Sequence, residues 1–323
     1  MRSSKKTVMK AAAAFVLLAV ILAGLDFLLY PCTFMRNDIH SVTTEAHDDI
    51  FMGTSHGKMN IDPDTVGEIT GRSGHNLCVG GEYGIDVYYM AKLLTETQKP
   101  KRIIYEIDPG YFVSEKEEGN NYLLFYHEFP FSMAKIEYFF DAVLECDLRS
   151  AVFPWYEYSL SYEIESLPDT VSKKLGGDYG IEDFKSDTQE YHENGFVERY
   201  PVDTTTLPFT EPVLFSEEKV SAQNMEYLER LIDLCKEENI EFVAVTTPIP
   251  AVTLNQYPEE YGDAWDYFET FFEEQGVEYM NFNTEYYDLF PHEMINYTDY
   301  DGHMNGDAAL RFSEILGIML KDY

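Results

Sequence analysis

Apolar and polar positions follow two different periods along most of the chain, and this pattern predicts strands separated by helices. Residues 240–246 form a continuous apolar run of the kind found in buried parallel strands. Because strands that alternate with helices usually pair in parallel, we expect a three-layer α/β domain with a parallel sheet. The predicted strands are residues 49–52, 76–79, 102–107, 240–246 and 277–280, and the predicted helices are 85–95, 133–148, 216–239, 265–274 and 306–320. In the helix 216–239, Ser216 is the expected N-cap, with an acidic first turn after it.

The middle of the chain lacks this alternation. Residues 113–215 are rich in Tyr, Phe, Glu and Pro, and only 133–148 has a convincing helical spacing. We therefore interpret about 113–215 as a long irregular insertion into one α/β domain that covers residues 36–323.

An apolar segment near the N-terminus predicts a membrane anchor. Four basic residues within the first ten positions precede the apolar run 11–25, and further apolar residues follow Asp26. A run of ~20 residues crosses a bilayer core, and basic residues in front of it favour a cytoplasmic N-terminus. We expect residues 1–35 to be a cytoplasmic tip and a single transmembrane helix in the cell membrane, with the domain extracytoplasmic. A cleaved signal peptide shares this layout, but no clean Ala-x-Ala site follows the run, which favours the uncleaved anchor.

The net charge of the chain limits the classes of molecule that we expect it to bind. The formal net charge of -35 repels phosphate backbones, so we expect no nucleic acid. Cys32, Cys78, Cys146 and Cys235 form no close pair, which excludes the common zinc-ribbon patterns. One disulfide is compatible with this spacing, but buried free thiols are favoured because Cys78 and Cys235 lie in apolar runs. We expect no metal and no cofactor.

Three segments place chemically active groups at the carboxyl ends of predicted strands, where sites of parallel α/β sheets gather. Gly53-Thr54-Ser55-His56-Gly57 follows the first strand and offers an exposed serine. Asn76-Leu-Cys-Val-Gly80-Gly81 belongs to the second strand, and its glycines allow a backbone N–H to approach a ligand. Thr298-Asp299-Tyr300-Asp301-Gly302-His303 precedes the last helix and supplies a histidine beside carboxylates, which is the orienting half of a triad.

In this order the three segments resemble the SGNH (GDSL-like) hydrolase superfamily. The chain is more closely similar to its membrane-anchored envelope branch, which includes alginate acetylation proteins and the D-alanine transfer protein of teichoic acid synthesis. The resemblance covers roughly residues 48–112 and 216–320. It implies a flavodoxin-like parallel sheet, Ser55 as nucleophile, His303 as base, and the backbone amides of Ser55 and Gly80 as oxyanion donors.

Two departures from the family pattern affect the expected site. The family usually places its aspartate three residues before the histidine, where this chain has Tyr300. Asp301 and Asp299 remain alternatives, with Asp301 slightly favoured. The family's Gly-x-Asn-Asp block, whose asparagine helps the oxyanion hole, is replaced by Glu106-Ile-Asp108-Pro109-Gly110. One missing donor typically costs ~2.7–4 kcal/mol of transition-state stabilisation.

Three further residues are candidates for the pocket: His56, Asp108 and Thr247. His56 has no second metal ligand at metal spacing, so a structural role is favoured for it. The expected function is a serine esterase or O-acyltransferase that acts on acyl esters of cell-envelope glycopolymers. Its partners would be a polysaccharide or teichoic-acid-like acceptor and a membrane-bound O-acyltransferase. The alternative is a catalytically degenerate envelope protein that binds glycan or such a partner.

Overall fold

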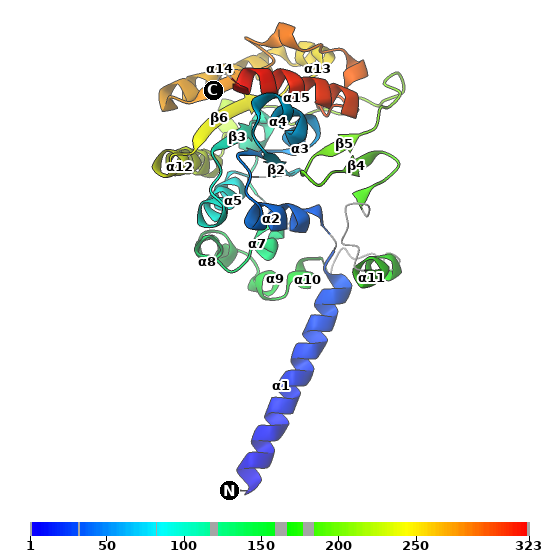
Figure 1. Cartoon of the computed structure of the whole chain (residues 1–323), viewed down its shortest axis with the longest axis vertical. Helices are drawn as coiled ribbons and strands as arrows, with labels where there is room; N and C mark the ends of the chain where they lie inside the picture. The colour runs from blue at the N-terminus through cyan, green and yellow to red at the C-terminus, as the bar shows by residue number, and fades with distance from the viewer. Residues whose placement is uncertain are drawn as a thin grey trace.

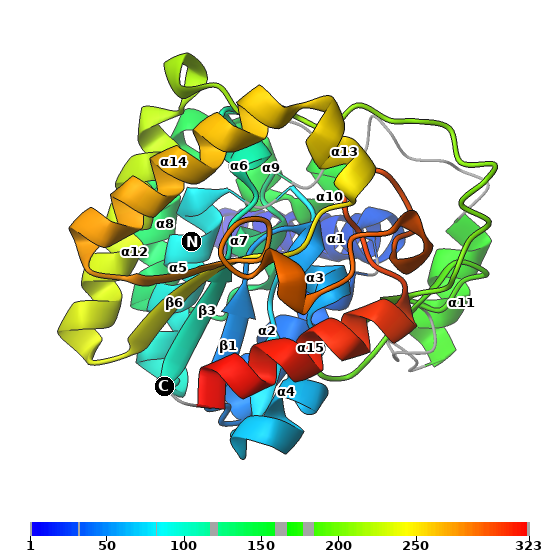
Figure 2. The ribbon, with the colours of Figure 1, turned by 90° about the horizontal axis from the view of Figure 1, so that it is seen from above.

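Five parallel strands form the centre of the domain (Figures 1 and 2). A computed structural model describes residues 2–31, 33–81, 83–116, 122–158, 167–176 and 184–321. The strands are β1 (Asp49–Met52), β2 (Gly74–Asn76), β3 (Arg102–Glu106), β6 (Glu241–Thr246) and β7 (Glu278–Asn281). They pair in parallel in the order β2-β1-β3-β6-β7. This is the flavodoxin-like order, so the predicted fold class is confirmed.

Alternating side chains of the strands divide between two cores, one on each face of the sheet. Ile50 and Met52 of β1 pack with helices α2 (Phe34–Thr44), α5 (Gly84–Thr97), α12 (Ala222–Glu238) and α14 (Pro258–Gln275). Phe51 packs on the other face with α4 (Pro63–Thr70) and α15 (Gly306–Lys321). Figure 2 shows α4 and α15 on one side of the sheet and α5, α12 and α14 on the other. The expected three layers are therefore present.

Most element bounds agree with the pattern of the sequence, and four do not; one of them is the helix predicted at 265–274, which begins seven residues earlier, at Pro258. The strand predicted at 76–79 is β2 at Gly74–Asn76, although the amides of Leu77 and Val79 still bond to carbonyls of the β1 end. The helix predicted from Ser216 begins at Ala222, because Ser221 caps it by accepting from the Asn224 amide; Ser216 precedes only a short 3-10 turn. The helix predicted at 133–148 ends at Asp141.

The insertion is more regular than its composition predicts. Its described parts hold several short helices and an antiparallel hairpin, so the expectation of an irregular stretch is wrong for them. Residues 193–195 form the hairpin loop, which the hydrogen bond from the His192 amide to the Phe196 carbonyl oxygen closes. A Cβ on Gly195 would lie 2.1 Å from the Asn76 carbonyl oxygen. The elements are α7 (Leu124–Glu128), α8 (Met133–Asp141), η1 (Val143–Glu145), α9 (Leu148–Val152), α10 (Pro154–Tyr158), α11 (Leu167–Gly176), β4 (Gln189–Tyr191) and β5 (Val197–Arg199).

The remaining short elements lie in the loops that connect the sheet to its helices. They are α3 (Ser55–Asn60), α6 (Pro109–Phe112), η4 (Glu217–Lys219), α13 (Ala251–Gln256), η5 (Tyr287–Leu289) and η6 (Met294–Asn296). Of these, α3 directly follows β1, and it packs against β5 and α15. It thus lies where the first strand, the insertion and the last helix meet.

The N-terminal helix α1 (Arg2–Leu29) projects away from the domain (Figure 1). Its segment Lys5–Leu29, 25 residues long, is apolar and long enough to cross a membrane, and none of its most apolar window is buried. Cys78 and Cys235 are buried, as predicted, and no disulfide joins two cysteines within the part of the chain that the structure describes. Cys32 lies outside the described residues.

Candidate active site

The turn after β1 places Ser55 at the edge of a cavity. Gly53 has a φ of 138°, and a Cβ there would lie 2.5 Å from the backbone oxygen of Glu106, so only glycine fits without a shift. Thr54 is the N-cap of α3: its hydroxyl accepts from the His56 amide and donates to Glu106 over 2.9 Å. The Thr54 amide also donates to that carboxylate over 2.9 Å. The end of β3 therefore fixes the turn that presents Ser55.

A loop before α15 brings His303 to Ser55. His303 Nε2 lies 2.8 Å from Ser55 Oγ, and His303 Nδ1 lies 2.8 Å from Asp299 Oδ2. These distances are those of hydrogen bonds in a serine–histidine–aspartate triad. An antiparallel bridge between Tyr297 and Met304 closes the loop. The structure thus brings together the serine and the histidine that the sequence singles out.

Asp299, and not Asp301, stands behind His303, so the preference for Asp301 is wrong. The reason is a local turn: Asp299 Oδ1 accepts from the backbone amides of Asp301, Gly302 and His303 over 3.1–3.2 Å. This turn folds the loop so that the side chain four residues before the histidine meets it. Asp301 instead points to His56, with 4.0 Å between Oδ2 and Nε2.

The charge of Asp299 is stabilised by its neighbours. Burial alone would raise the pKa of this carboxyl, but hydrogen bonds from His303 and the charge of its ring hold the pKa well below its usual range. Arg199 Nη1, from β5 in the insertion, lies 3.6 Å from Asp299 Oδ2. Asp299 is therefore an anion that can support a positive charge on His303.

Asn60 connects α3 to the loop that carries His303, which we call the histidine loop. It is fully buried at the end of α3, and its Nδ2 donates to Gly302 O over 3.0 Å and to Thr247 Oγ1 over 3.1 Å. Its Oδ1 accepts from the Met304 amide over 2.8 Å. Sequence reasoning missed this residue, and Thr247, expected in the pocket wall, is instead its buried partner.

His56 lies behind His303 in a cage of carboxylates. The two rings are 4.7 Å apart, and His56 Nδ1 is 3.4 Å from Asp108 Oδ2 and 4.0 Å from Glu106 Oε1. Burial lowers the pKa of His56, but the charges of Asp108, Asp301 and Glu106 outweigh it and raise the pKa to about 9. Burial raises the pKa of both Glu106 and Asp108. His56 and Asp108 thus form an ionic cluster beside the triad, and they line a small cavity next to α6.

Among the described residues, one group has ligand atoms close enough for a metal ion: His56, Asp301 and His303. Both ring nitrogens of His303 already face Ser55 and Asp299. A metal on this group would compete with the triad, so the donor set fits acid–base chemistry better than metal binding.

Gly80 lies beside the serine, as the resemblance implies. A Cβ on Gly80 would be 3.6 Å from the Cβ of Ser55, and both residues line the same cavity. Asn76 holds this region to α3: its Nδ2 donates to Gly57 O and Ile61 O over 2.8 Å each, and its Oδ1 accepts from the Cys78 amide over 3.0 Å. The backbone of Gly80 is therefore fixed next to the proposed nucleophile.

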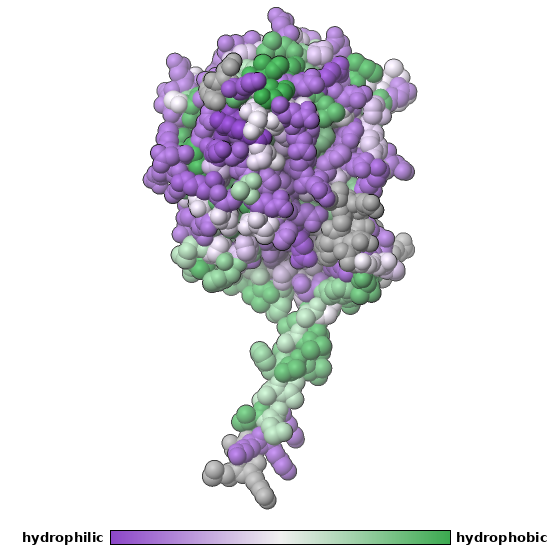
Figure 3. Space-filling view, viewed as in Figure 1, coloured by the Kyte–Doolittle hydropathy of each residue, from purple (hydrophilic) through white to green (hydrophobic). Residues whose placement is uncertain are grey.

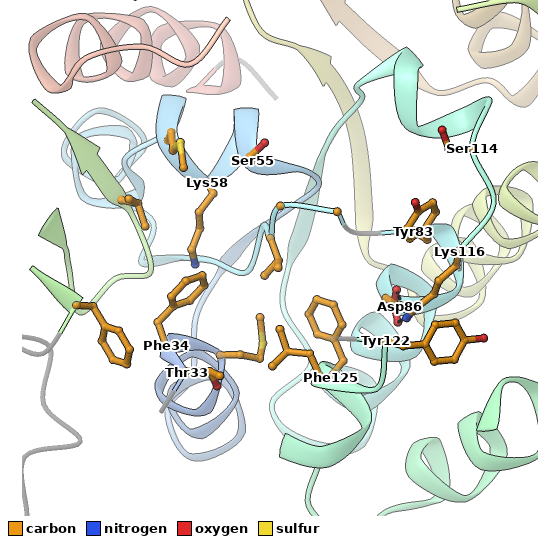
Figure 4. A pocket seen from close by; sticks show the side chains of 18 of the residues that line it. Thr33, Phe34, Ser55, Lys58, Tyr83, Asp86, Ser114, Lys116, Tyr122 and Phe125 are labelled. Atoms are coloured by element: carbon orange, nitrogen blue, oxygen red, sulfur yellow. Dashed lines mark hydrogen bonds and ion pairs between the residues drawn. The ribbon is translucent and has the colours of Figure 1, made fainter. Parts of the chain in front are cut away.

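The cavity at Ser55 has a volume of about 1020 Å³ and extends well beyond the triad (Figure 4). Near Ser55 its wall includes Lys58, whose amine is buried on Asp38 at 2.8 Å. At the far side the pair Asp86–Lys116 lines it. Apolar side chains also line the cavity; they include Phe34, Met35, Val79, Leu124, Phe125 and Phe184. Such a cavity suits a ligand with both apolar and polar parts.

Three contributors escaped the sequence reasoning in full or in part. Asn60 and Arg199 were not singled out, and Glu106 was considered only as a pocket or turn residue. Arg199 carries no local signal, because the insertion folds over α3 through long-range contacts. Asn60 is buried at the end of α3, the helix that begins at Ser55, and this position is likewise visible only in three dimensions.

No family model matches the sequence, and no curated protein matches it. Several solved structures match, among them the following two. One is a protein from Desulfitobacterium hafniense DCB-2 whose assignment to the G-D-S-L lipolytic family is itself a prediction; it has 10% identity and a TM-score of 0.39 over 84% of this chain and 98% of its own. The other, from Bacteroides fragilis NCTC 9343, is a predicted acylhydrolase with 9% identity and a TM-score of 0.41 over 90% of this chain and 97% of its own. Likeness at this level carries no argument about activity.

Proposed function

We propose that this protein is an SGNH-type serine esterase or O-acyltransferase in which Ser55, His303 and Asp299 form the catalytic triad. One observation carries the proposal: the continuous line of hydrogen-bond distances from Ser55 Oγ through the His303 ring to Asp299, at 2.8 Å each. A serine alone is a weak nucleophile, and a positioned base with an anion behind it is the arrangement that activates it.

The geometry supports a two-step acyl transfer. Ser55 Oγ attacks the carbonyl carbon of an acyl ester while its proton passes to His303 Nε2. Asp299 stabilises the imidazolium, and the amides of Ser55 and Gly80 are the proposed donors to the oxyanion. The tetrahedral intermediate collapses, the ester C–O bond breaks, and the leaving alcohol takes the proton from His303. Water or an acceptor hydroxyl then attacks the acyl-Ser55 carbonyl while its proton passes to His303. The bond between the acyl carbon and Ser55 Oγ breaks, Ser55 Oγ takes the proton back from His303, and the acyl group leaves on the water or the acceptor.

The proposed setting is the outer side of the cell membrane, with an acyl ester of an envelope glycopolymer as substrate or acceptor. The helix α1 supports this location, because its basic residues precede the apolar span and favour a cytoplasmic N-terminus. The polar groups Asp86 and Lys116 line the same cavity as Ser55, and they are the proposed contacts for the hydroxyl groups of an acceptor. A membrane-bound O-acyltransferase is the proposed partner that supplies or receives the acyl group.

A fluorophosphonate probe tests the proposal, because it reacts only with an activated serine. The wild-type chain should be labelled, and Ser55→Ala should abolish the label. Ser114→Ala is the matched control, since Ser114 lines the same cavity but lies outside the triad, and it should keep the label. Labelling that persists in Ser55→Ala would refute the assignment. Absence of labelling in the wild-type chain would support the degenerate binding protein instead.

A further inference from the structure

We infer that the end of the domain next to α1 lies in the lipid interface, and that the cavity at Ser55 takes a lipid-borne acyl ester from there. The second half of this inference rests on the proposed function, whereas the first half does not. The relevant elements are α8, η1, α9, α10 and α11, which surround the end of the domain from which α1 leaves (Figure 1). The proposal commits to one occupant of this surface, the bilayer.

Exposed apolar side chains gather on these elements and on the loop before them. We call this set the apolar collar, and Figure 3 shows apolar surface at the base of the domain around α1. Its members and their exposed fractions are Phe131 91%, Met133 57%, Phe140 61%, Leu144 48%, Leu148 47%, Val152 65% and Leu175 73%. Apolar patches of this kind on a soluble surface usually mark a membrane or protein contact.

The position of α1 indicates that the apolar collar contacts a membrane and not another protein. The apolar span Lys5–Leu29 has 25 residues, which at 1.5 Å each is roughly 37 Å and longer than the ~30 Å hydrocarbon core. Its last turn is therefore at the level of the membrane surface. Elements that touch this turn must lie at the same level, and both α10 and α11 contact α1.

The domain is held close to the end of α1. Lys174 of α11 donates to the carbonyl oxygens of Phe27, over 2.6 Å, and Tyr30. The Tyr30 side chain is buried: its ring meets those of His127 and Tyr158 at 5.8 and 5.6 Å, and its hydroxyl donates to Glu128 over 2.9 Å. These contacts fix the orientation that brings the collar to the bilayer.

The cavity extends from the nucleophile toward this same end. Thr33, Phe34 and Met35, which begin a few residues after α1, line it together with Ser55. The helix α7 adds apolar wall, and it contacts both α2 and the collar helix α8. In Figure 4, Phe34 and Phe125 lie on the side of the cavity away from Ser55. An acyl chain that enters from the lipid would therefore pass along apolar side chains with its ester toward Ser55.

Two tryptophans allow a direct test, because the chain contains only two. Trp155 is in α10, next to α1, and Trp265 is in α14, at the opposite end of the domain (Figure 1). Trp265→Phe leaves Trp155 as the only indole, and Trp155→Phe leaves Trp265. The full chain is placed in nanodiscs of phosphatidylcholine with brominated acyl chains, and its fluorescence is compared with that in unbrominated discs.

Bromine should quench the chain that retains Trp155 severalfold more than the chain that retains Trp265. Equal quenching of the two, or none in either, would overturn the inferred membrane contact. This readout needs no catalysis. A quenched Trp155 with no fluorophosphonate labelling would refute the proposed function alone, and labelling without quenching would refute the membrane contact alone.

A matched pair of surface variants tests the source of the substrate. Val152→Asp puts a charge on the collar, and Ile295→Asp puts one at a similarly exposed site in η6, since the exposed fractions are 65% and 69%. Val152→Asp should lower turnover of a diacylglycerol ester in phosphatidylcholine discs about tenfold. This is the expected effect of losing the free energy gained when one valine side chain is buried in the lipid. Turnover of water-soluble p-nitrophenyl acetate should stay unchanged in both. Equal losses on the lipid ester in both variants would overturn a route from the membrane.

Discussion

Replacing Asp299 by asparagine should abolish catalysis by forcing His303 into the wrong tautomer. Three backbone amides, from Asp301, Gly302 and His303, donate to Asp299 Oδ1. In the Asn variant the side-chain oxygen has to face these donors, because its NH₂ group cannot accept a hydrogen bond. The NH₂ group then faces His303 Nδ1 and donates to it. The ring proton moves to Nε2, and the nitrogen next to Ser55 can no longer accept the serine proton.

The expected loss is large because the substitution leaves the fold intact and removes only the base. The corresponding change in other serine hydrolases with a triad lowers kcat by about 10⁴-fold, equivalent to ~5 kcal/mol of transition-state stabilisation. The charge of Asp299, whose pKa is held low by His303, is also lost next to the developing imidazolium. The structure thus predicts an effect as large as in an established triad.

Asp301→Asn is the matched control, since Asp301 is two residues away, carries the same charge and has a side chain 43% exposed. It should reduce activity about fivefold at most, because an exposed ion pair contributes ~0–1 kcal/mol. Hydrolysis of p-nitrophenyl acetate and the rate of fluorophosphonate labelling measure both variants, with circular dichroism as a check of folding. A greater loss in Asp301→Asn than in Asp299→Asn would refute the reasoning.

Three further substitutions probe the surroundings of the triad. His56→Gln should remove one pH dependence of the free energy of unfolding. The fold raises the pKa of His56 from 6.5 to about 9, so the charged ring stabilises the fold by roughly 3 kcal/mol below pH 6.5. This stabilisation is lost as the pH rises through 9. Urea unfolding at pH 6 and pH 10 measures it, and parallel losses in wild type and variant would contradict it. Asn60→Ala should cost about 3 kcal/mol, because it leaves buried partners in the histidine loop unpaired, and labelling should slow; unchanged unfolding would show that the loop is held otherwise. Gly53→Ala should cost at least about 3 kcal/mol through its clash with Glu106 and its positive φ, and a soluble variant of wild-type thermal stability would contradict this.

Much of the sheet could be predicted from the sequence because buried parallel strands carry a strong local signal. Residues 49–52 and 240–246 are short apolar runs, and they coincide with β1 and, to one residue, with β6. The bounds of helices were less predictable. Two serines near the start of α12 are both able to cap a helix, and only the packed structure selects Ser221. The hairpin of the insertion had a usable signal in Asn194-Gly195, a frequent turn pair, which the sequence reasoning did not use.

The candidate site was predictable where position in a parallel sheet determines it. Ser55 and His303 each follow from the rule that chemistry gathers at the carboxyl ends of strands. The choice between Asp299 and Asp301 was not predictable, because it depends on a loop conformation in which three backbone amides donate to Asp299. The sequence did carry one signal for Asp299: it stands three residues before Gly302, a spacing at which an aspartate can accept from the backbone amides of a turn. Arg199 could not be found at all, since its approach to Asp299 requires the insertion to be placed in space.

The separation of the site along the chain also bears on biosynthesis. Ser55 and His303 lie 248 positions apart, and the histidine loop directly precedes α15. During synthesis the serine is made early, but it meets its base only after the last helix has packed against α3 and α4. Long-range contacts of this kind form late and slowly. A nascent or truncated chain would therefore carry an unactivated serine, and the proposed acyl chemistry would begin only once the whole domain has folded.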